Sequence, residues 1–194
     1  MRVIAGTAGG LQLHVPRSGV RPTMDRVKAA IFSSLGPQVI DADVLDLFAG
    51  TGALGIEALS RGAATATFVE SSRTTARVIE RNLTTAKLQG RIRVQDVFRF
   101  LRSGAEIFDI VLADPPYEKT SSGESYTALL LHDPSLVSLL RPDGALVLEK
   151  RPGEPLPPLH FWKLDRARRY GATEVLFLSP VATRQAALGS RHSS

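Results

Sequence analysis

The sequence predicts an α/β protein with a Rossmann-like, mostly parallel sheet of seven strands. Between residues 44 and 149, short apolar runs alternate with segments of helical periodicity, which is typical of parallel strands with helices on both faces. Only Tyr170-Gly171-Ala172 separates the last two apolar runs, and a connection that short forms a hairpin, not a crossover. We therefore expect a series of parallel strands followed by a C-terminal antiparallel hairpin.

Apolar periodicity places each element of this fold. Strands are predicted over residues 44–48, 65–70, 91–95, 108–113, 144–149, 161–169 and 173–179. Helices are predicted over residues 53–61, 72–87, 97–103 and 125–140. A further helix precedes the first of these strands, because Thr23 is a suitable N-cap and Gly36-Pro37 ends the helical pattern that follows it.

A short extension is expected before the main domain. Residues 2–5 and 11–15 predict two short strands on either side of a glycine-rich turn, hence a β-hairpin. The last residues lose all periodicity and are expected to be flexible. The predicted organisation is a hairpin extension over 1–22, a main domain over 23–180 and a tail over 181–194.

The amino-acid composition excludes several kinds of functional site and indicates where the protein acts. The 194 residues are sufficient for one α/β domain with its own core. The sequence has no cysteine, which excludes disulfides, thiol catalysis and cysteine-zinc sites, and its four histidines are scattered, so no metal site is expected. Because the N-terminus lacks the apolar run of a signal peptide and no segment is long enough to span a membrane, we expect a cytoplasmic protein.

Positive charge is concentrated at the two ends of the chain. The formal net charge is +5; residues 1–36 carry five basic side chains against one acidic one, and residues 160–194 carry six against two. This distribution favours a polyanionic partner such as RNA. Solvated helix ends, or a charged strand edge that prevents edge pairing, would explain the same arginines. The candidate RNA contacts are Arg21, Arg26, Arg166 and Arg168.

A glycine-rich loop follows the first strand of the parallel series. Gly50, Gly52 and Gly55 match the dinucleotide-binding spacing G-x-G-x-x-G between a strand and a helix. Glu70 ends the next strand, where an acid could bind the hydroxyl pair of a ribose. One interpretation is therefore a nicotinamide-dependent dehydrogenase, with a pyrophosphate at the helix N-terminus near Ala53.

Three features favour S-adenosylmethionine as the cofactor instead. Asp46 lies just before the loop, where it would balance a cationic amino acid group but disfavour a diphosphate. Asp96 follows the third strand, within reach of an adenine amine. The sequence Asp-Pro-Pro-Tyr at the end of the fourth strand suits an enzyme that methylates an amine and has no evident use in hydride transfer. The candidate cofactor-binding residues are Asp46, Phe48, Gly50, Thr51, Gly52, Glu70 and Asp96.

The candidate catalytic residues are Asp114, Pro115, Pro116 and Tyr117. Neither proline can donate a hydrogen bond to a sheet ladder, so the pair fixes a stiff turn directly after the strand. Asp114 and a backbone carbonyl would accept the N–H groups of an amine, and Tyr117 would stack on the ring that carries it. A rigid loop in which Asp114 is only a turn former is the alternative.

A combination of segments is more specific than any single motif. It comprises Arg21 to Val27, Asp46 to Gly62, Val69-Glu70, Asn82, Asp96, Asp114 to Tyr117 and Tyr170-Gly171. In these segments the chain resembles the bacterial RsmD family, methyltransferases that modify a guanine N2 amine in 16S ribosomal RNA. The resemblance extends from about residue 2 to residue 179. It implies a class I methyltransferase fold and S-adenosylmethionine as the cofactor.

The resemblance also implies roles for the candidate residues. Asp46, Gly50 and Gly52 would face the methionine part of S-adenosylmethionine, Glu70 its ribose and Asp96 its adenine. The segment 114–117 would hold the target guanine. The implied partner is 16S rRNA within an assembled or assembling small ribosomal subunit, and we expect a monomer that needs neither a metal nor a membrane.

The chain departs from the family pattern in two places. The turn from Gly6 to Gln12 lacks the arginines that family members usually carry there, and Ala29 stands where the family usually has a glutamate. Two other functions stay open. The enzyme could methylate an adenine N6 amine in RNA or DNA, or the chain could be a non-catalytic RNA-binding assembly factor that keeps the fold.

Overall fold

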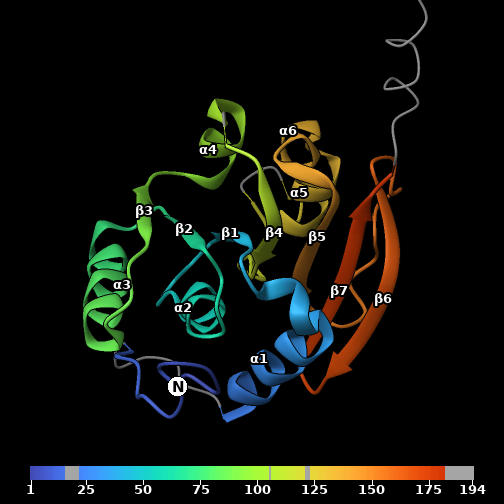
Figure 1. Ribbon diagram of the computed structural model, residues 1–194. Coiled ribbons are helices and arrows are strands. Elements are labelled where there is room, and N and C mark those ends of the chain that lie inside the picture. The colour runs from blue at the N-terminus through green and yellow to red at the C-terminus, as the bar shows by residue number, and fades with distance from the viewer. Residues whose placement is uncertain (16–21, 105, 121–122, 182–194) are drawn as a thin grey trace, which may run out of the picture.

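The structure is a computed structural model that describes residues 1–15, 22–104, 106–120 and 123–181. A seven-stranded sheet forms its centre and helices cover both faces (Figure 1). The strand order is β3-β2-β1-β4-β5-β7-β6, in which β1 to β5 are parallel and β7 runs antiparallel between β5 and β6. The predicted mostly parallel sheet with a C-terminal antiparallel hairpin is confirmed.

The strands are β1 (Asp43–Leu47), β2 (Thr65–Glu70), β3 (Arg91–Val94), β4 (Phe108–Ala113), β5 (Leu140–Lys150), β6 (Trp162–Tyr170) and β7 (Thr173–Pro180). The helices are α1 (Pro22–Leu35), α2 (Ala53–Ser60), α3 (Arg73–Ala86), α4 (Val97–Ser103), α5 (Tyr126–His132) and α6 (Pro134–Ser138), with a 3-10 turn η1 (Gly36–Val39) after α1. Within the described residues, no helix has the length and apolar character needed to cross a membrane.

Two apolar layers, one on each face of the sheet, hold the helices in place. On one face, Val44 and Phe68 belong to a cluster that includes α1, α2 and α3. On the other face, Leu45 and Val111 belong to a cluster with α4, α5 and α6. Neighbours such as Val44 and Leu45 enter opposite layers because side chains alternate along a strand. Burial on both faces explains why these strands are continuous apolar runs in the sequence.

The prediction of a single helix over residues 125–140 is wrong. The segment forms two short helices, α5 and α6, and β5 already begins at Leu140. Pro134 is the first residue of α6, and its missing N–H and ring are incompatible with a helix interior. Asp133 ends α5 and caps α6, because its Oδ1 accepts the N–H of Ser135 at 2.8 Å.

The N-terminal segment forms the predicted antiparallel hairpin around a single bridge, because the N–H groups of Val3, Gly10 and Leu13 donate to the carbonyls of Leu11, Val3 and Met1. Arg2 and Gln12 make this antiparallel bridge. The N–H groups of Ile4 and Ala5 donate instead to the carboxylate of Glu57 in α2, at 2.7 and 3.1 Å. Pairing in the hairpin therefore stops at Val3, and a buried side chain binds the N–H groups that follow.

The boundaries of the predicted domains fall largely outside the described residues. Helix α1 begins at Pro22, one residue before the predicted N-cap Thr23. The predicted loop before it includes residues 16–21, which are not described, and neither is the predicted tail beyond Val181. The division into extension, main domain and tail therefore stays a prediction.

Candidate active site

Two cavities lie at the carboxyl-terminal edge of the parallel strands. The larger, about 480 Å³, is lined by the loop after β1, by α1, by the N-terminal segment and by the ends of β4 and β5. The smaller, about 320 Å³, is lined by the ends of β2 and β4 and by the starts of α4 and α5. Phe48 and Asp114 line both, so the cavities meet between β1 and β4. The strand order reverses there, and open α/β sheets bind ligands at such a point.

The glycine loop connects β1 to α2 and forms part of the larger cavity. Gly52 caps α2 with a φ of 76°, and a Cβ there would lie 2.9 Å from Cγ2 of Ile79. Gly52 is thus fixed by the turn and by packing, and it lines neither cavity. Gly50 and Thr51 do line the larger one. The N–H of Gly50 donates to Oε2 of Glu70 at 3.0 Å, which ties the loop to the end of β2.

Three carboxyl side chains gather where β1, β4 and β5 end. Asp46, Asp114 and Glu149 all line the larger cavity, although Asp46 is only 2% exposed. Oδ2 of Asp46 accepts the N–H of Gly55 at 2.9 Å. Neither Asp114 nor Glu149 forms a side-chain hydrogen bond or an ion pair with any residue that the structure describes. We call these three residues the carboxyl cluster.

The pKa values of all three acids in the carboxyl cluster are raised above their ordinary values. Burial raises the pKa of Asp46 to about 8, and the charges of Asp114 and Glu70 act in the same direction. Burial raises the pKa of Asp114 to about 6. Burial, with the charges of the other two acids, also raises the pKa of Glu149 well above its ordinary value. The described residues provide no group of acids and histidines arranged to hold a metal ion.

Two further acids lie at the smaller cavity and are oriented by backbone N–H groups. Glu70 accepts the N–H of Gly50 on Oε2 and the N–H of Ser72 on Oε1, at 3.0 and 2.8 Å. Asp96 caps α4, because its Oδ1 accepts the N–H of Arg99 at 2.9 Å. A carboxylate accepts about four hydrogen bonds, so both acids keep acceptor capacity for a ligand.

The Asp-Pro-Pro-Tyr turn follows β4 and reaches the surface. Pro115 is buried, whereas Pro116 is exposed and lines the smaller cavity. Tyr117 is 37% exposed, and its hydroxyl and Oγ1 of Thr173 in β7 are 3.0 Å apart, a hydrogen bond. The guanidinium of Arg151 lies 5.6 Å from the centre of the Tyr117 ring. Arg151 therefore covers part of the ring that was predicted to stack on a base.

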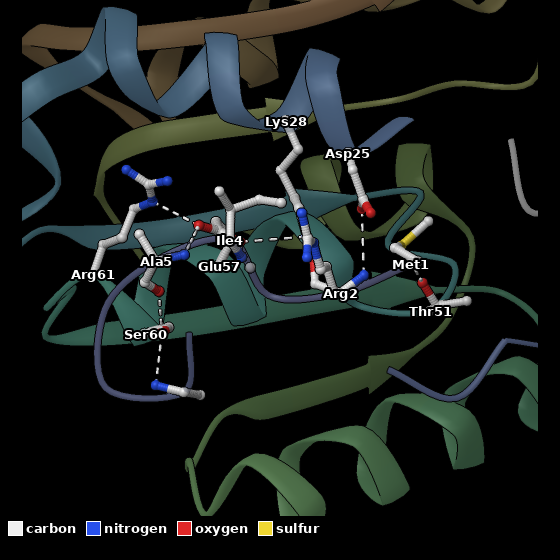
Figure 2. A network of polar contacts seen from close by, with 12 residues as sticks. Met1, Arg2, Ile4, Ala5, Asp25, Lys28, Thr51, Glu57, Ser60 and Arg61 are labelled. Atoms are coloured by element: carbon white, nitrogen blue, oxygen red, sulfur yellow. Dashed lines mark hydrogen bonds and ion pairs between the residues drawn. The ribbon is translucent and has the colours of Figure 1, made fainter. Parts of the chain in front are cut away.

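A buried ion cluster anchors the N-terminal segment to α1 and α2 (Figure 2). Glu57 is fully buried, and its carboxylate lies 2.7 Å from Nε of Arg61 and 3.3 Å from Nζ of Lys28. The same carboxylate accepts the N–H groups of Ile4 and Ala5. Lys28 also lines the larger cavity, so this Glu57 cluster fixes one wall of it.

Asn82 of α3 makes a second connection between the N-terminal segment and the glycine loop. Its Nδ2 donates to the carbonyls of His14 and Thr51, both at 3.0 Å. Its Oδ1 accepts the N–H of His14 at 2.7 Å. One buried amide thus holds both segments beside the larger cavity.

Sequence reasoning missed Glu149, Lys28 and Glu57. Glu149 lies near the end of β5, as Asp46 and Glu70 do on their strands, so the same pattern of an acid at a strand end could have identified it. Glu57 and Lys28 lie on helices, and no signal in the sequence distinguishes them from exposed charges.

The arginines predicted to contact RNA lie outside these cavities where the structure describes them. Arg21 is not among the described residues. Arg26 is exposed on α1, and Arg166 and Arg168 are exposed on β6. The guanidinium of Arg166 lies 5.9 Å from the centre of the Phe177 ring. Their role in RNA binding stays a prediction.

The fold and the site together define the class of protein. Acids at the ends of β1, β2, β4 and β5 and at the start of α4 surround a glycine loop, and the sheet inserts its antiparallel β7 beside β5. The carboxyl cluster and the acids of the smaller cavity fit the cationic amino acid and the adenosine of S-adenosylmethionine, respectively. The chain is a class I methyltransferase that depends on S-adenosylmethionine.

Comparison with known proteins identifies the family. A family model described as "Conserved hypothetical protein 95" matches residues 1–179. Ribosomal RNA small subunit methyltransferase D of Escherichia coli K12 is 39% identical over 176 residues, which is 88% of this chain and 85% of that protein. The protein of the same name from Haemophilus influenzae is 34% identical over 177 residues, 88% of this chain and 89% of its own. This chain belongs to that family, the RsmD family.

A solved structure agrees with this assignment. A hypothetical protein of Thermus thermophilus superposes with a TM-score of 0.77 at 30% sequence identity. The match covers 93% of this chain and 99% of that one. The similarity therefore extends over the whole fold, including the region of the site.

Proposed function

We propose that this chain transfers the methyl group of S-adenosylmethionine to the exocyclic N2 amine of a guanine in 16S ribosomal RNA. The observation that carries the proposal is the position of Asp114, which lines both cavities at the end of β4. An amine held there would lie between the predicted cofactor site and the open side of the larger cavity. The names of the curated relatives support small-subunit rRNA as the substrate.

The residues that would hold the cofactor divide between the two cavities. Asp46 and Glu149 of the carboxyl cluster would balance the positive charge of the methionine part in the larger cavity, together with Gly50 and Thr51 of the loop. Glu70 would accept the ribose hydroxyls and Asp96 the adenine amine in the smaller one. When bound there, S-adenosylmethionine supplies an electrophilic methyl group on a sulfonium.

Asp114 would orient the target amine and stabilise the positive charge that develops on its nitrogen. The lone pair of a guanine N2 amine is delocalised into the ring, so the amine is a weak nucleophile. Asp114 and a carbonyl of the proline turn would accept its N–H bonds and aim the lone pair at the methyl group. Positive charge then develops on N2, and a neighbouring carboxylate stabilises that charge and favours departure of the proton. Positioning and electrostatics would supply most of the rate enhancement.

We further propose that the chain acts as a cytoplasmic monomer on an assembled or assembling small ribosomal subunit. The net charge of +5 and the exposed arginines of α1 and β6 support binding to a polyanion. The base would leave its helix or loop to reach the larger cavity, since a paired base does not present its amine to a buried carboxyl.

Transfer of a tritiated methyl group, followed by nucleoside analysis, tests the proposal. The substrates are unmethylated small subunits, free 16S rRNA and DNA, and the expected product is N2-methylguanosine from rRNA or subunits only. A labelled N6-methyladenosine would replace the proposal by the adenine alternative. Binding of S-adenosylmethionine without label in any substrate would favour a non-catalytic assembly factor.

A further inference from the structure

A third hollow adjoins the active site on the side of the β6–β7 hairpin. It measures about 450 Å³ and is lined by Tyr117, Arg151, Pro152, Arg169, Gly171 and Ala172. Ala172 also lines the larger active-site cavity, and the hydrogen bond between Tyr117 and Thr173 lies between the two spaces. A polymer that inserts one unit into the larger cavity can therefore continue directly into this hollow.

The hollow is positively charged. Arg151 is exposed, lies against the ring of Tyr117 and donates to the Tyr117 carbonyl at 3.4 Å. Nε of Arg169 donates to the carbonyl of Gly171 at 3.4 Å, which holds the side chain at the hairpin turn. Neither arginine forms an ion pair with the described part of the chain, so most of their N–H groups stay available to a ligand.

The acid opposite Arg169 does not cancel this charge. Glu174 is the cross-strand neighbour of Arg169 in the β6–β7 hairpin. Its carboxylate is bound by Nζ of Lys150 at 2.7 Å, and Lys150 is itself only 2% exposed. Because a buried lysine already balances Glu174, this acid is not an ion-pair partner of Arg169.

We infer that Arg151 and Arg169 bind the phosphodiester that joins the target guanosine to its neighbour. This subsite rests on the proposed function. A planar guanidinium matches a phosphate with two parallel hydrogen bonds. The inference adds Arg151 and Arg169 to the arginines predicted from the sequence.

Steady-state methylation of small subunits by Arg151→Ala, Arg169→Ala and the double variant tests the subsite. Each single substitution is expected to raise KM for RNA about fivefold to tenfold, as for removal of a charge-assisted hydrogen bond of about 1–1.5 kcal/mol. The Kd for S-adenosylmethionine should stay at its wild-type value. The slope of log affinity against log salt should fall by about 0.7 for each phosphate that is no longer bound. Arg151→Lys, which keeps the charge but loses the planar fork, should fall between Arg151→Ala and wild type.

Arg102→Ala is the matched control, because Arg102 is exposed on α4 and lines a different hollow. It removes the same charge and should leave KM and the salt slope unchanged. Equal KM values and salt slopes for Arg151→Ala, Arg169→Ala and Arg102→Ala, with an active wild type, would overturn the subsite and leave the proposed function standing. A wild-type protein that methylates no rRNA would overturn both.

Discussion

The Glu57 cluster and the carboxyl cluster are two sets of buried ionisable side chains that differ in how their charges are satisfied. Glu57 meets Lys28, Arg61 and two backbone N–H groups, so each oxygen has a partner. In the carboxyl cluster, Asp46 has one backbone partner, and neither Asp114 nor Glu149 hydrogen-bonds to a described residue. The first cluster is complete within the protein, whereas the second keeps acceptor oxygens that are open to a ligand.

This difference separates a structural site from a functional one. Burial of paired charges fixes the position of the N-terminal segment, because losing one partner would leave the other buried and uncompensated. Burial of three acids together raises their pKa values instead. Such perturbed acids in a cavity are typical of functional sites. Substitutions in the first cluster should therefore reduce stability, and substitutions in the second should reduce activity.

The largest expected effect is on stability, from Glu57→Gln. The neutral amide would leave Lys28 and Arg61 without their carboxylate partner in a buried position. We expect the free energy of unfolding to fall by about 3–5 kcal/mol, the usual cost of removing one member of a buried ion pair. Urea denaturation followed by circular dichroism measures this change.

Two variants control the Glu57 experiment. Glu80→Gln on α3 is exposed and should change the free energy of unfolding by less than about 0.5 kcal/mol. Adding Lys28→Met to Glu57→Gln removes one orphaned charge and should recover part of the loss. A Glu57→Gln protein as stable as Glu80→Gln would mean that the pairing does not anchor the N-terminal segment.

The second-largest expected effect is a loss of catalytic rate in the variant Asp114→Ala. We expect kcat to fall about 10²–10³-fold, as when one group that stabilises transition-state charge is removed. The free energy of unfolding should not fall, because a buried, unpaired carboxyl is removed. Binding of S-adenosylmethionine should change only slightly, since Asp46, Glu70 and Asp96 remain. Single-turnover methylation with calorimetric cofactor binding measures both, and near-wild-type turnover would remove Asp114 from the reaction.

The strands of the sheet could be predicted from the sequence more completely than the side-chain contacts around the site. Continuous apolar runs are a direct consequence of burial on both faces, so the strands and their parallel order followed from them. The acids 46, 70, 96 and 114 were found because each follows or ends a strand. The hairpin of the N-terminal segment was predicted, but its pairing is shorter than expected, because the N–H groups of Ile4 and Ala5 bond to Glu57 of α2, a contact between distant segments.

Two other features were not predicted from the sequence, one for a local reason and one for a tertiary reason. Asp133-Pro134 marks a helix start, yet the apolar periodicity of the surrounding residues favoured one long helix. Arg151 follows directly on β5 and was not distinguished from other surface arginines. Its position against Tyr117 depends on the pairing of β5 with β7, which brings Thr173 beside the Asp-Pro-Pro-Tyr turn.

The smallest expected effect is the pH dependence of cofactor affinity, which distinguishes the two clusters in solution. The pKa of Asp46 is raised to about 8, so this carboxyl is mostly protonated between pH 6 and pH 7.5 before a ligand binds. A bound cation favours the ionised carboxylate, so binding should release a proton in this range. Below about pH 7 the amino group of S-adenosylmethionine keeps its charge, because α-amino groups titrate at about 7.7–8.0, so the dependence on pH is steepest there. Release of one proton makes the affinity rise about tenfold per pH unit.

Isothermal titration calorimetry from pH 6 to pH 7.5, in buffers of different ionisation enthalpy, measures both the affinity and the protons released. Asp46→Asn keeps an oxygen that can accept the Gly55 N–H but cannot ionise, so its affinity should be lower and almost independent of pH. Glu149→Gln should keep the pH dependence of Asp46 with a smaller slope, because Glu149 adds its own raised pKa to the cluster. A wild-type affinity that stays constant over this range, with no proton release, would show that the positive charge of the cofactor does not lie against the carboxyl cluster.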